Sequence, residues 1–314
     1  MLAFKGWGPL LVGLLYIVSA QSAHAAGEGF SLSEREPSVS GFQRQVATFS
    51  VDGLQQHALL LWPAGDVPSS GHPVVLFAHG YHPDPPNYGR IGSGETSRPG
   101  DYYRGLVGAY AAAGYVVVVP DYRGHNESAG FEFTERFLAP HWYARDLLGA
   151  LNGLLSLQEV DADRVFAVGH SMGSTVLQLA APHMDARVRA VSLWSTARLD
   201  YRARILANAV KAQGGMDRHS LGKPDLRRFE EELRAVKPID SREFAELQVP
   251  VLMHHAEDDQ VTPLENSLVI AMDRYLAGTP YTLHTYDSDA HLLKGEQFEQ
   301  AVSRDLDFFS GLSD

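Results

Sequence analysis

The 314-residue chain carries 26 Lys and Arg residues against 38 Asp and Glu residues, a formal net charge of −12. This balance, without any Lys- or Arg-rich block, argues against a nucleic-acid partner, because phosphate binding requires basic patches. Cysteine is absent, which excludes disulfides, a thiol nucleophile and a cysteine metal site. The composition, 45% hydrophobic and 20% charged, is that of a globular protein, and the length allows one large α/β domain or two smaller ones.

The N-terminal 25 residues have the pattern of a secretory signal peptide. Lys5 precedes an apolar stretch from Leu10 to Ala20, and Ala23-His24-Ala25 offers small residues where signal peptidase cleaves. We expect cleavage after Ala25 and an exported protein, periplasmic or secreted. An uncleaved membrane anchor is the alternative, but an apolar core of about a dozen residues is shorter than the roughly 20 that a span requires. We therefore expect no stable membrane span in the mature chain.

Strands and helices alternate along most of the remaining sequence. Residues 26–42 are polar and are expected to form a flexible lead-in to a domain that covers residues 43–314. The alternation predicts an α/β fold with a mostly parallel central sheet and helices on both faces. The expected strands are Gln43–Ser50, Gln55–Trp62, Val74–Ala78, Tyr115–Val119, Arg164–Val168, Val188–Trp194, Val249–His254 and Tyr281–Tyr286, and the expected helices are Tyr102–Ala113, His141–Leu157, Leu264–Leu276 and Gln297–Phe309.

Two segments do not fit simple alternation. A long loop rich in Pro and Gly is expected at residues 81–100, and irregular loops of that length are often functional. Between Trp194 and Val249 lie about fifty charged, helix-prone residues. We expect them to form an inserted helical cap at about residues 196–247, above the carboxyl ends of the strands, where open α/β sheets hold their active sites. A surface excursion without a functional role is the alternative.

The motif Gly169-His170-Ser171-Met172-Gly173 lies between a predicted strand and a helix-compatible stretch. Strand, sharp turn with a serine, and helix follow one another in the order that a nucleophile elbow requires. Such a turn strains the serine backbone and leaves no space for a side chain at the motif glycines. The positive end of the helix then points at the serine, where negative charge develops during acyl transfer.

A serine hydroxyl needs a base to accept its proton and an acid to orient that base. The strand that ends at His254 leads into an acidic turn that contains Asp258 and Asp259. The last predicted strand is followed by a loop that contains His291. Serine, acid and histidine thus follow one another in the order known for α/β hydrolases.

Several motifs in this order and spacing resemble those of the α/β-hydrolase superfamily, from about residue 43 to the end of the chain. Within it, the chain is similar to dienelactone-hydrolase-like esterases and to the catalytic domains of prolyl-oligopeptidase-type peptidases. Two positions depart from these relatives: His255 stands where many have Gly, and Tyr81 follows His79-Gly80 where peptidase-type members often have a second Gly. The similar stretches are His79-Gly80, Pro120-Asp121-Tyr122-Arg123-Gly124, residues 160–165, residues 169–173, Asp259-Gln260-Val261-Thr262-Pro263 and Ala290-His291.

The resemblance implies the α/β-hydrolase fold and a role for individual residues. Ser171 would be the nucleophile, and His291 the general base and later the general acid. Asp259 would orient His291; it is favoured over Asp258 because it precedes x-Val-x-Pro, as the family acid does. The backbone N–H groups of Tyr81 and Met172 would form the oxyanion hole.

Four other histidines lie near these motifs and are expected to be structural. We expect His79 and His170 to pack and hydrogen-bond under the loops, because one histidine suffices for a triad. His254 and His255 could suggest a metal ion, but adjacent strand residues point to opposite faces, so no metal is expected. The chemistry of a serine triad also needs no cofactor.

The expected activity is hydrolysis of carboxylic esters through an acyl-enzyme. An ester is favoured because its leaving group is better, and because the large N-terminal propeller of similar oligopeptidases is not recognisable in the sequence. One alternative is an exported serine peptidase that acts on short peptides or acylated amino acids. Another is a non-catalytic ligand-binding module, against which the complete set of serine, acid and histidine argues. The expected partner is thus a small ester or a short acyl or peptide substrate; the oligomeric state stays open.

Overall fold

The computed structural model describes residues 29–37, 41–90, 99–136, 138–184, 186–197, 227, 231, 232, 234 and 241–312. Within them, the strands form one sheet in the order β1-β2-β3-β5-β4-β6-β7-β8-β9. The proposed signal peptide lies outside the described residues, as does most of the expected cap. No helix among the described residues combines the length and the apolar character that crossing a bilayer requires.

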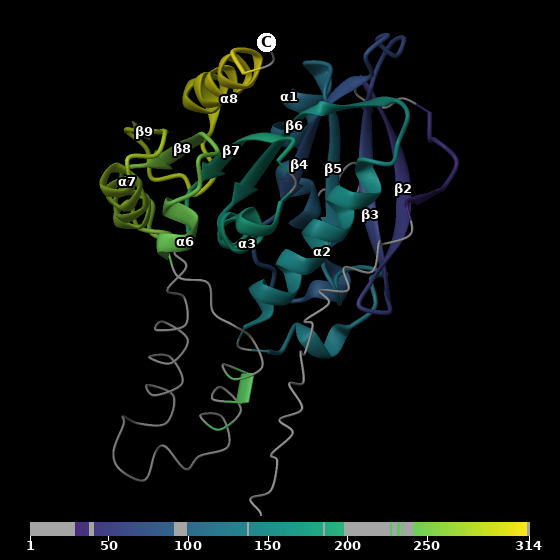
Figure 1. Ribbon diagram of the computed structural model, residues 1–314, viewed down its shortest axis with the longest axis horizontal. Coiled ribbons are helices and arrows are strands. Elements are labelled where there is room, and N and C mark those ends of the chain that lie inside the picture. The colour runs from purple at the N-terminus through teal and green to yellow at the C-terminus, as the bar shows by residue number, and fades with distance from the viewer. Residues whose placement is uncertain are drawn as a thin grey trace, which may run out of the picture.

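The sheet begins with an antiparallel hairpin and continues as a parallel sheet (Figure 1). β1, β2 and β3 are antiparallel neighbours, and β3 is antiparallel to β5. All later pairs are parallel, which confirms the predicted mostly parallel sheet. The strands are β1 (Ser31–Leu32), β2 (Phe42–Val51), β3 (Leu54–Pro63), β4 (His72–Ala78), β5 (Val116–Asp121), β6 (Val160–His170), β7 (Val188–Trp194), β8 (Val251–Ala256) and β9 (Tyr281–Tyr286).

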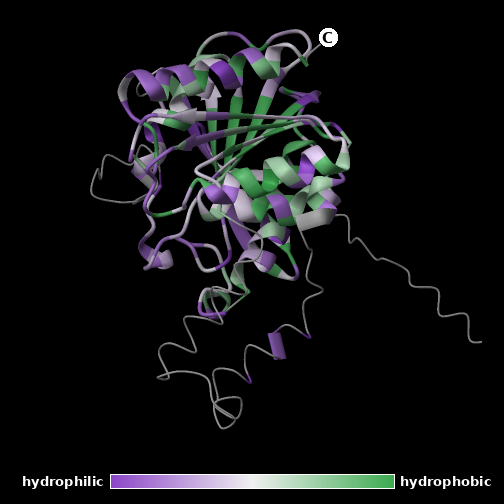
Figure 2. Ribbon diagram, turned by 90° about the vertical axis from the view of Figure 1, so that its left-hand side faces the viewer, coloured by the Kyte–Doolittle hydropathy of each residue, from purple (hydrophilic) through white to green (hydrophobic). Residues whose placement is uncertain are grey.

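Helices cover both faces of the sheet, as predicted. α2, α3, α6 and α7 pack on one face, where Leu147, Leu177, Phe244 and Ile270 belong to one buried cluster. α1 and α8 pack on the other face. Figure 2 shows the hydrophobic strands enclosed between these helices. The helices are α1 (Arg104–Ala112), α2 (Ala139–Leu154), α3 (Met172–Ala180), α6 (Ser241–Ala245), α7 (Glu265–Ala277) and α8 (Gly295–Ser310), and short 3₁₀ turns are η1 (Pro85–Asn87), η2 (Pro99–Tyr103), η3 (Phe131–Phe133) and η4 (Ala181–His183).

The structure corrects the expected lead-in. Residues Ser31–Leu32 pair with β2 as an edge strand, so part of this segment belongs to the sheet. The ring of Phe30 also packs against Phe49, with a distance of 5.4 Å between centroids. Two residues are too few to show an alternating pattern, so the sequence offered no strand signal here.

Two element boundaries also differ from the prediction. Pro120 lies inside β5 rather than ending it, where it is aligned with Ala58 of β3. The pairing of β5 with β4 ends two residues earlier, at Val118, so the missing N–H of Pro120 breaks no ladder on that side. Helix α1 begins at Arg104 instead of Tyr102, because the preceding residues form η2.

A fully buried ion pair joins the loop after β5 to helix α2. Both oxygens of Asp146 accept hydrogen bonds from the Arg123 guanidinium, at 2.7 Å from Nη2 and 3.0 Å from Nε. Asp52, at the β2–β3 turn, adds a second carboxylate 3.0 Å from Nη2 of Arg123. Neither side chain of the Arg123–Asp146 pair is exposed to solvent. The pair therefore fixes the loop after β5 between the hairpin and α2.

We predict that Asp146→Ala lowers the free energy of unfolding by about 3–5 kcal/mol, because it leaves the Arg123 charge buried without its main partner. Asp161→Ala is the control, since Asp161 pairs with Arg164 at a partly exposed site; its expected cost is about 0–1 kcal/mol. Urea denaturation of both variants measures the difference. Equal losses would contradict the assignment of Arg123–Asp146 as a buried structural pair.

Candidate active site

Ser171 lies at a strained turn between β6 and α3. Its backbone has φ 56° and ψ −125°, a conformation that non-glycine residues rarely adopt. A Cβ atom on Gly173 would lie 1.9 Å from the carbonyl oxygen of Ala78, and one on Gly169 would lie 2.7 Å from the carbonyl oxygen of Gly173. Both motif glycines are therefore required by the space between β4, β6 and α3, which is the geometry expected of a nucleophile elbow.

Asp259 and His291 meet at the same edge of the sheet. Nδ1 of His291, in the loop after β9, lies 2.8 Å from Oδ2 of Asp259, in the loop after β8. Because a carboxylate only accepts, Nδ1 carries the proton and Nε2 holds the lone pair. Within the part of the chain that the structure describes, Nε2 of His291 makes no hydrogen bond. The competing carboxylate, Asp258, is exposed.

Asp259 is held in its charged form by a set of donors. Burial by itself would raise its pKa, but hydrogen bonds from His291 and from the N–H groups of Thr262 and Val261 outweigh burial and lower the pKa below its usual value. Those N–H groups lie 3.0 and 2.8 Å from Oδ1. The Thr262 hydroxyl donates to Oδ2 at 2.9 Å. Asp259 is thus a fixed, ionised acceptor for the imidazole of His291.

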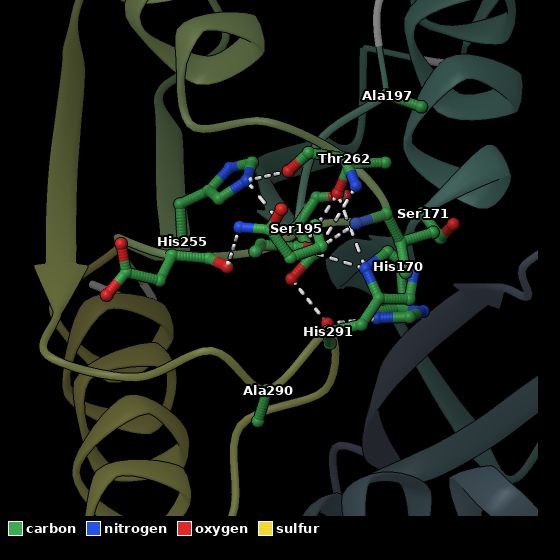
Figure 3. A network of polar contacts seen from close by, with 12 residues as sticks. His170, Ser171, Ser195, Ala197, His255, Thr262, Ala290 and His291 are labelled. Atoms are coloured by element: carbon green, nitrogen blue, oxygen red, sulfur yellow. Dashed lines mark hydrogen bonds and ion pairs between the residues drawn. The ribbon is translucent and has the colours of Figure 1, made fainter.

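His291 is anchored beside the serine turn through its main chain (Figure 3). Its carbonyl oxygen accepts hydrogen bonds from Nε2 of His170 at 2.8 Å and from the Ser195 hydroxyl at 2.5 Å. The rings of His170 and His291 are 4.6 Å apart between centroids, and Ser171 directly follows His170. Among the described residues, the Ser171 hydroxyl has no hydrogen-bond partner. The main chain of His291 is therefore fixed beside the residue that precedes Ser171, and among the described residues no hydrogen bond joins the Ser171 hydroxyl to the His291 ring.

The ends of β4 and β6 come together at the serine. A Cβ atom on Gly80 would lie 3.2 Å from Cβ of Ser171, so the backbone that leads to Tyr81 passes directly against the serine. The N–H of Gly80 already donates to the Tyr103 hydroxyl at 2.9 Å. Met172 is the first residue of helix α3, so its N–H has no hydrogen-bond partner within the helix. These are the positions from which Tyr81 and Met172 were expected to contribute backbone donors.

The unusual His255 supports the acid loop. Its Nδ1 lies 2.7 Å from the Ser267 hydroxyl on α7, and its Nε2 lies 2.7 Å from the carbonyl oxygen of Thr262. Burial lowers the pKa of His255, so the ring is neutral and donates from Nε2. The imidazole therefore ties the loop that carries Asp259 to helix α7. His254 points to the other face of β8, where Nε2 is 3.1 Å from Asp305.

The remaining histidine of the motifs is also structural. His79 stacks between Tyr88 and Tyr122, at 4.3 and 4.1 Å between ring centroids. Burial lowers the pKa of His79 well below its usual value. Among the described residues, no group of three or more His, Asp or Glu side chains could hold a metal ion. A cavity of about 340 Å³ lies at the opposite edge of the sheet, between Met184, Val188, Leu247 and Val249, and does not reach Ser171.

Comparison with known proteins identifies the family. The sequence profile of the prolyl oligopeptidase family matches residues 105–313. The match extends from α1 to the end of α8 and includes Ser171, Asp259 and His291. No curated protein matches the chain.

Solved structures share the fold at low sequence identity. Acylaminoacyl peptidase from Pyrococcus horikoshii has a TM-score of 0.62 and 19% identity, over 87% of this chain and 42% of that one. Acetyl xylan esterase 1 from Thermoanaerobacterium sp. has a TM-score of 0.59 and 20% identity, over 91% and 88%. Dipeptidyl peptidase 4 from Porphyromonas gingivalis has a TM-score of 0.60 and 19% identity, over 86% and 36%. The chain thus spans less than half the length of these peptidases and most of the esterase.

The lowered pKa of Asp259 predicts a pH dependence of stability. Its folded-state pKa lies below the unfolded value of about 3.9, so its contribution is complete above about pH 5 and is lost as the pH falls toward the folded pKa. Asp259→Asn is therefore expected to be less stable than the wild type at pH 7, with a shallower loss of stability between about pH 5 and pH 3.

Chemical denaturation at a series of pH values measures both effects. Asp258→Asn is the control, since it removes an exposed carboxylate from the same loop. This control should keep the wild-type slope. A wild-type slope in Asp259→Asn would contradict the ionised, donor-rich state of Asp259.

Proposed function

The chain belongs to the prolyl oligopeptidase family of serine hydrolases with the α/β-hydrolase fold, and from this premise we propose that it cleaves carboxylic esters with Ser171, His291 and Asp259 as its triad. One observation carries the proposal. The imidazole of His291 is held by Asp259 through Nδ1, at 2.8 Å, and its ring lies 4.6 Å between centroids from that of His170, the residue before the elbow serine. A base oriented in this way can accept the proton of a serine hydroxyl.

The proposed reaction has two halves. Nε2 of His291 takes the Ser171 proton while Oγ attacks the ester carbonyl carbon, and Asp259 stabilises the imidazolium that forms. The N–H groups of Met172 and Tyr81 stabilise the oxyanion, together with the positive end of α3. His291 then gives the proton to the leaving alcohol, which leaves an acyl group on Ser171. Water, deprotonated by His291, attacks the acyl carbon and releases the acid, and the proton returns to Ser171.

The extent of the structural likeness supports an ester rather than a peptide. The acetyl xylan esterase is matched over 88% of its own chain, whereas the two peptidases are matched over 42% and 36%. Most of each peptidase thus has no counterpart in the match. An ester also has a better leaving group and makes a smaller demand on the site. The family match itself keeps a peptidase of short peptides or acylated amino acids as the second candidate.

We predict that the wild-type protein hydrolyses p-nitrophenyl acetate and butyrate, and that Ser171→Ala lowers kcat/KM by about 10⁴-fold or more, because the covalent step is lost. Ser303→Ala is the matched control, since Ser303 is exposed on α8. A fluorophosphonate probe should label the wild type and the Ser303→Ala variant at Ser171 and leave Ser171→Ala unlabelled.

A panel of aminoacyl and N-acyl-aminoacyl p-nitroanilides separates the two candidates. Turnover of anilides without turnover of esters would replace the esterase by the peptidase. If neither class is hydrolysed and the probe does not react with Ser171, the enzymatic proposal is overturned in favour of a ligand-binding module on the same fold.

We also propose that residues 1–25 direct export of the protein. The support is the charge and apolar pattern of that segment. N-terminal sequencing of the protein recovered outside the cytoplasm tests the proposal, with Ala26 expected as the first residue. Recovery of an intact Met1 in the cytoplasm would contradict it.

A further inference from the structure

A chain of buried hydrogen bonds crosses the site beneath Ser171. The N–H of Gly80 lies 2.9 Å from Oη of Tyr103, and this oxygen lies 2.8 Å from Nδ1 of His170. Nε2 of His170 lies 2.8 Å from the carbonyl oxygen of His291. Tyr103 and His170 are 4% and 1% exposed, so water does not compete for these bonds. Figure 3 shows the last contact, where His170 lies against His291.

Only one arrangement of protons satisfies every contact in this chain. The His291 carbonyl can only accept, so Nε2 of His170 carries a proton. Burial, followed by the neighbouring His291, lowers the pKa of His170 to about 3, so the ring is neutral and Nδ1 accepts. The Tyr103 hydroxyl must then donate to Nδ1 and accept from the N–H of Gly80. Burial raises the pKa of Tyr103, which keeps its proton in place.

The hydrogen-bond chain joins the two parts of the proposed catalytic machinery, the oxyanion donors and the base. Gly80 precedes Tyr81, whose N–H is a proposed oxyanion donor, and its backbone lies against Ser171. The other end is the main chain of His291, the proposed base. The segments that meet are far apart in the sequence: the end of β4, the turn η2, the end of β6 and the loop after β9.

The neighbouring tyrosine of η2 lies beside His170, with 6.0 Å between the ring centroids. Burial and then the charge of Asp259 raise the pKa of Tyr102 to about 12. The Ser195 hydroxyl gives the His291 carbonyl a second donor, at 2.5 Å. The main chain of His291 is thus held at its carbonyl by groups that do not touch Nε2, the proposed proton acceptor.

We propose that Tyr103 and His170 are positioning residues, which hold the oxyanion loop at Gly80–Tyr81 and the main chain of His291 in a fixed mutual arrangement. The inference rests on the proposed function for its catalytic meaning, but the hydrogen-bond chain itself does not. Loss of a link lets the base and the oxyanion donors shift relative to Ser171. Such shifts reduce the rate of the chemical step more than they reduce substrate binding.

Two substitutions of His170 separate positioning from packing. His170→Gln places an amide nitrogen near the Nε2 position, so it can still donate to the His291 carbonyl. His170→Asn places its amide near the Nδ1 position, so it can contact Tyr103 but is too short to reach His291. With p-nitrophenyl acetate, we expect His170→Asn, which loses the direct contact with the His291 main chain, to lower kcat by about 10–100-fold with KM unchanged, and His170→Gln, which loses only the Tyr103 contact, to lower kcat less.

Tyr103→Phe tests the other link without touching His170. It should lower kcat by about 10–100-fold at unchanged KM, because both Gly80 and His170 lose their partner. Tyr110→Phe is the matched control: this buried phenol donates to Asp305, and it is not part of the chain. It should reduce the melting temperature without the loss of kcat. Equal kcat in Tyr103→Phe and Tyr110→Phe, or equal losses in His170→Asn and His170→Gln, would overturn the proposal.

A readout independent of turnover separates this inference from the esterase proposal. Nitrogen-15 NMR of the histidine rings, assigned with the His170→Asn variant, should show His170 neutral and protonated at Nε2 from pH 5 to 8, and Tyr103→Phe should shift the signals of His170 and His291. These results without ester hydrolysis would overturn the proposed function and leave the hydrogen-bond chain supported. A proton at Nδ1 of His170 would overturn the chain, whatever the activity.

Discussion

The structure depends on one constraint, the strained turn at Ser171 between β6 and α3. A non-glycine residue at φ 56° costs on the order of 1–3 kcal/mol, which the surroundings must offset. β6 is paired on both sides, with β4 and β7, and the N–H of Ser171 donates to the carbonyl of Trp194. Helix α3 is buried along most of its length. The turn is therefore held by the core of the molecule, and the two motif glycines follow from how closely β4 and α3 approach it.

The parallel sheet explains why residues distant in the sequence meet at this turn. Parallel strands present their carboxyl ends at one edge, so the loops after β4, β6, β7, β8 and β9 all reach the same place. Gly80, His170, Ser195, Asp259 and His291 come from these loops or strand ends. The loop after β5 reaches this edge too, because β5 is parallel to β4; there Arg123 is fixed by its ion pair with Asp146, and the Tyr122 hydroxyl donates to the carbonyl of His79.

Short motifs and single strands are encoded in the local sequence, whereas the contacts between them are not. Strands β7 and β9 have the predicted ends, because each is a β-forming run with clear polar boundaries. The positions of Ser171, Asp259 and His291 were indicated by motifs whose local spacing encodes a strand end and a loop. Their roles stay predictions, and most of the expected cap lies outside the described residues.

The contacts that surround the site could not be predicted from local sequence patterns. His170 was expected to pack and hydrogen-bond under the loops, but its partners were not predicted, and Tyr103 and Ser195 were not singled out, because the contacts join separate elements of the fold. The sequence shows that His255 replaces the Gly of many relatives. Only the fold shows the role of His255, which is a hydrogen bond that joins the Asp259 loop to Ser267 on α7. Arg123 likewise belongs to a recognisable motif, yet its partner Asp146 is 23 positions away on α2.

The physical chemistry of the histidines narrows the choice of the base to one ring. Burial lowers the pKa of His79, His170 and His255, so each stays neutral, and each donates to a backbone carbonyl. His254 has a carboxylate partner in Asp305, but neither side chain of that pair is exposed. His291 alone of these five combines an ionised partner with an accessible ring, 20% exposed. A base must receive a proton from a substrate-facing hydroxyl and must be stabilised once charged, and within this set only His291 meets both requirements.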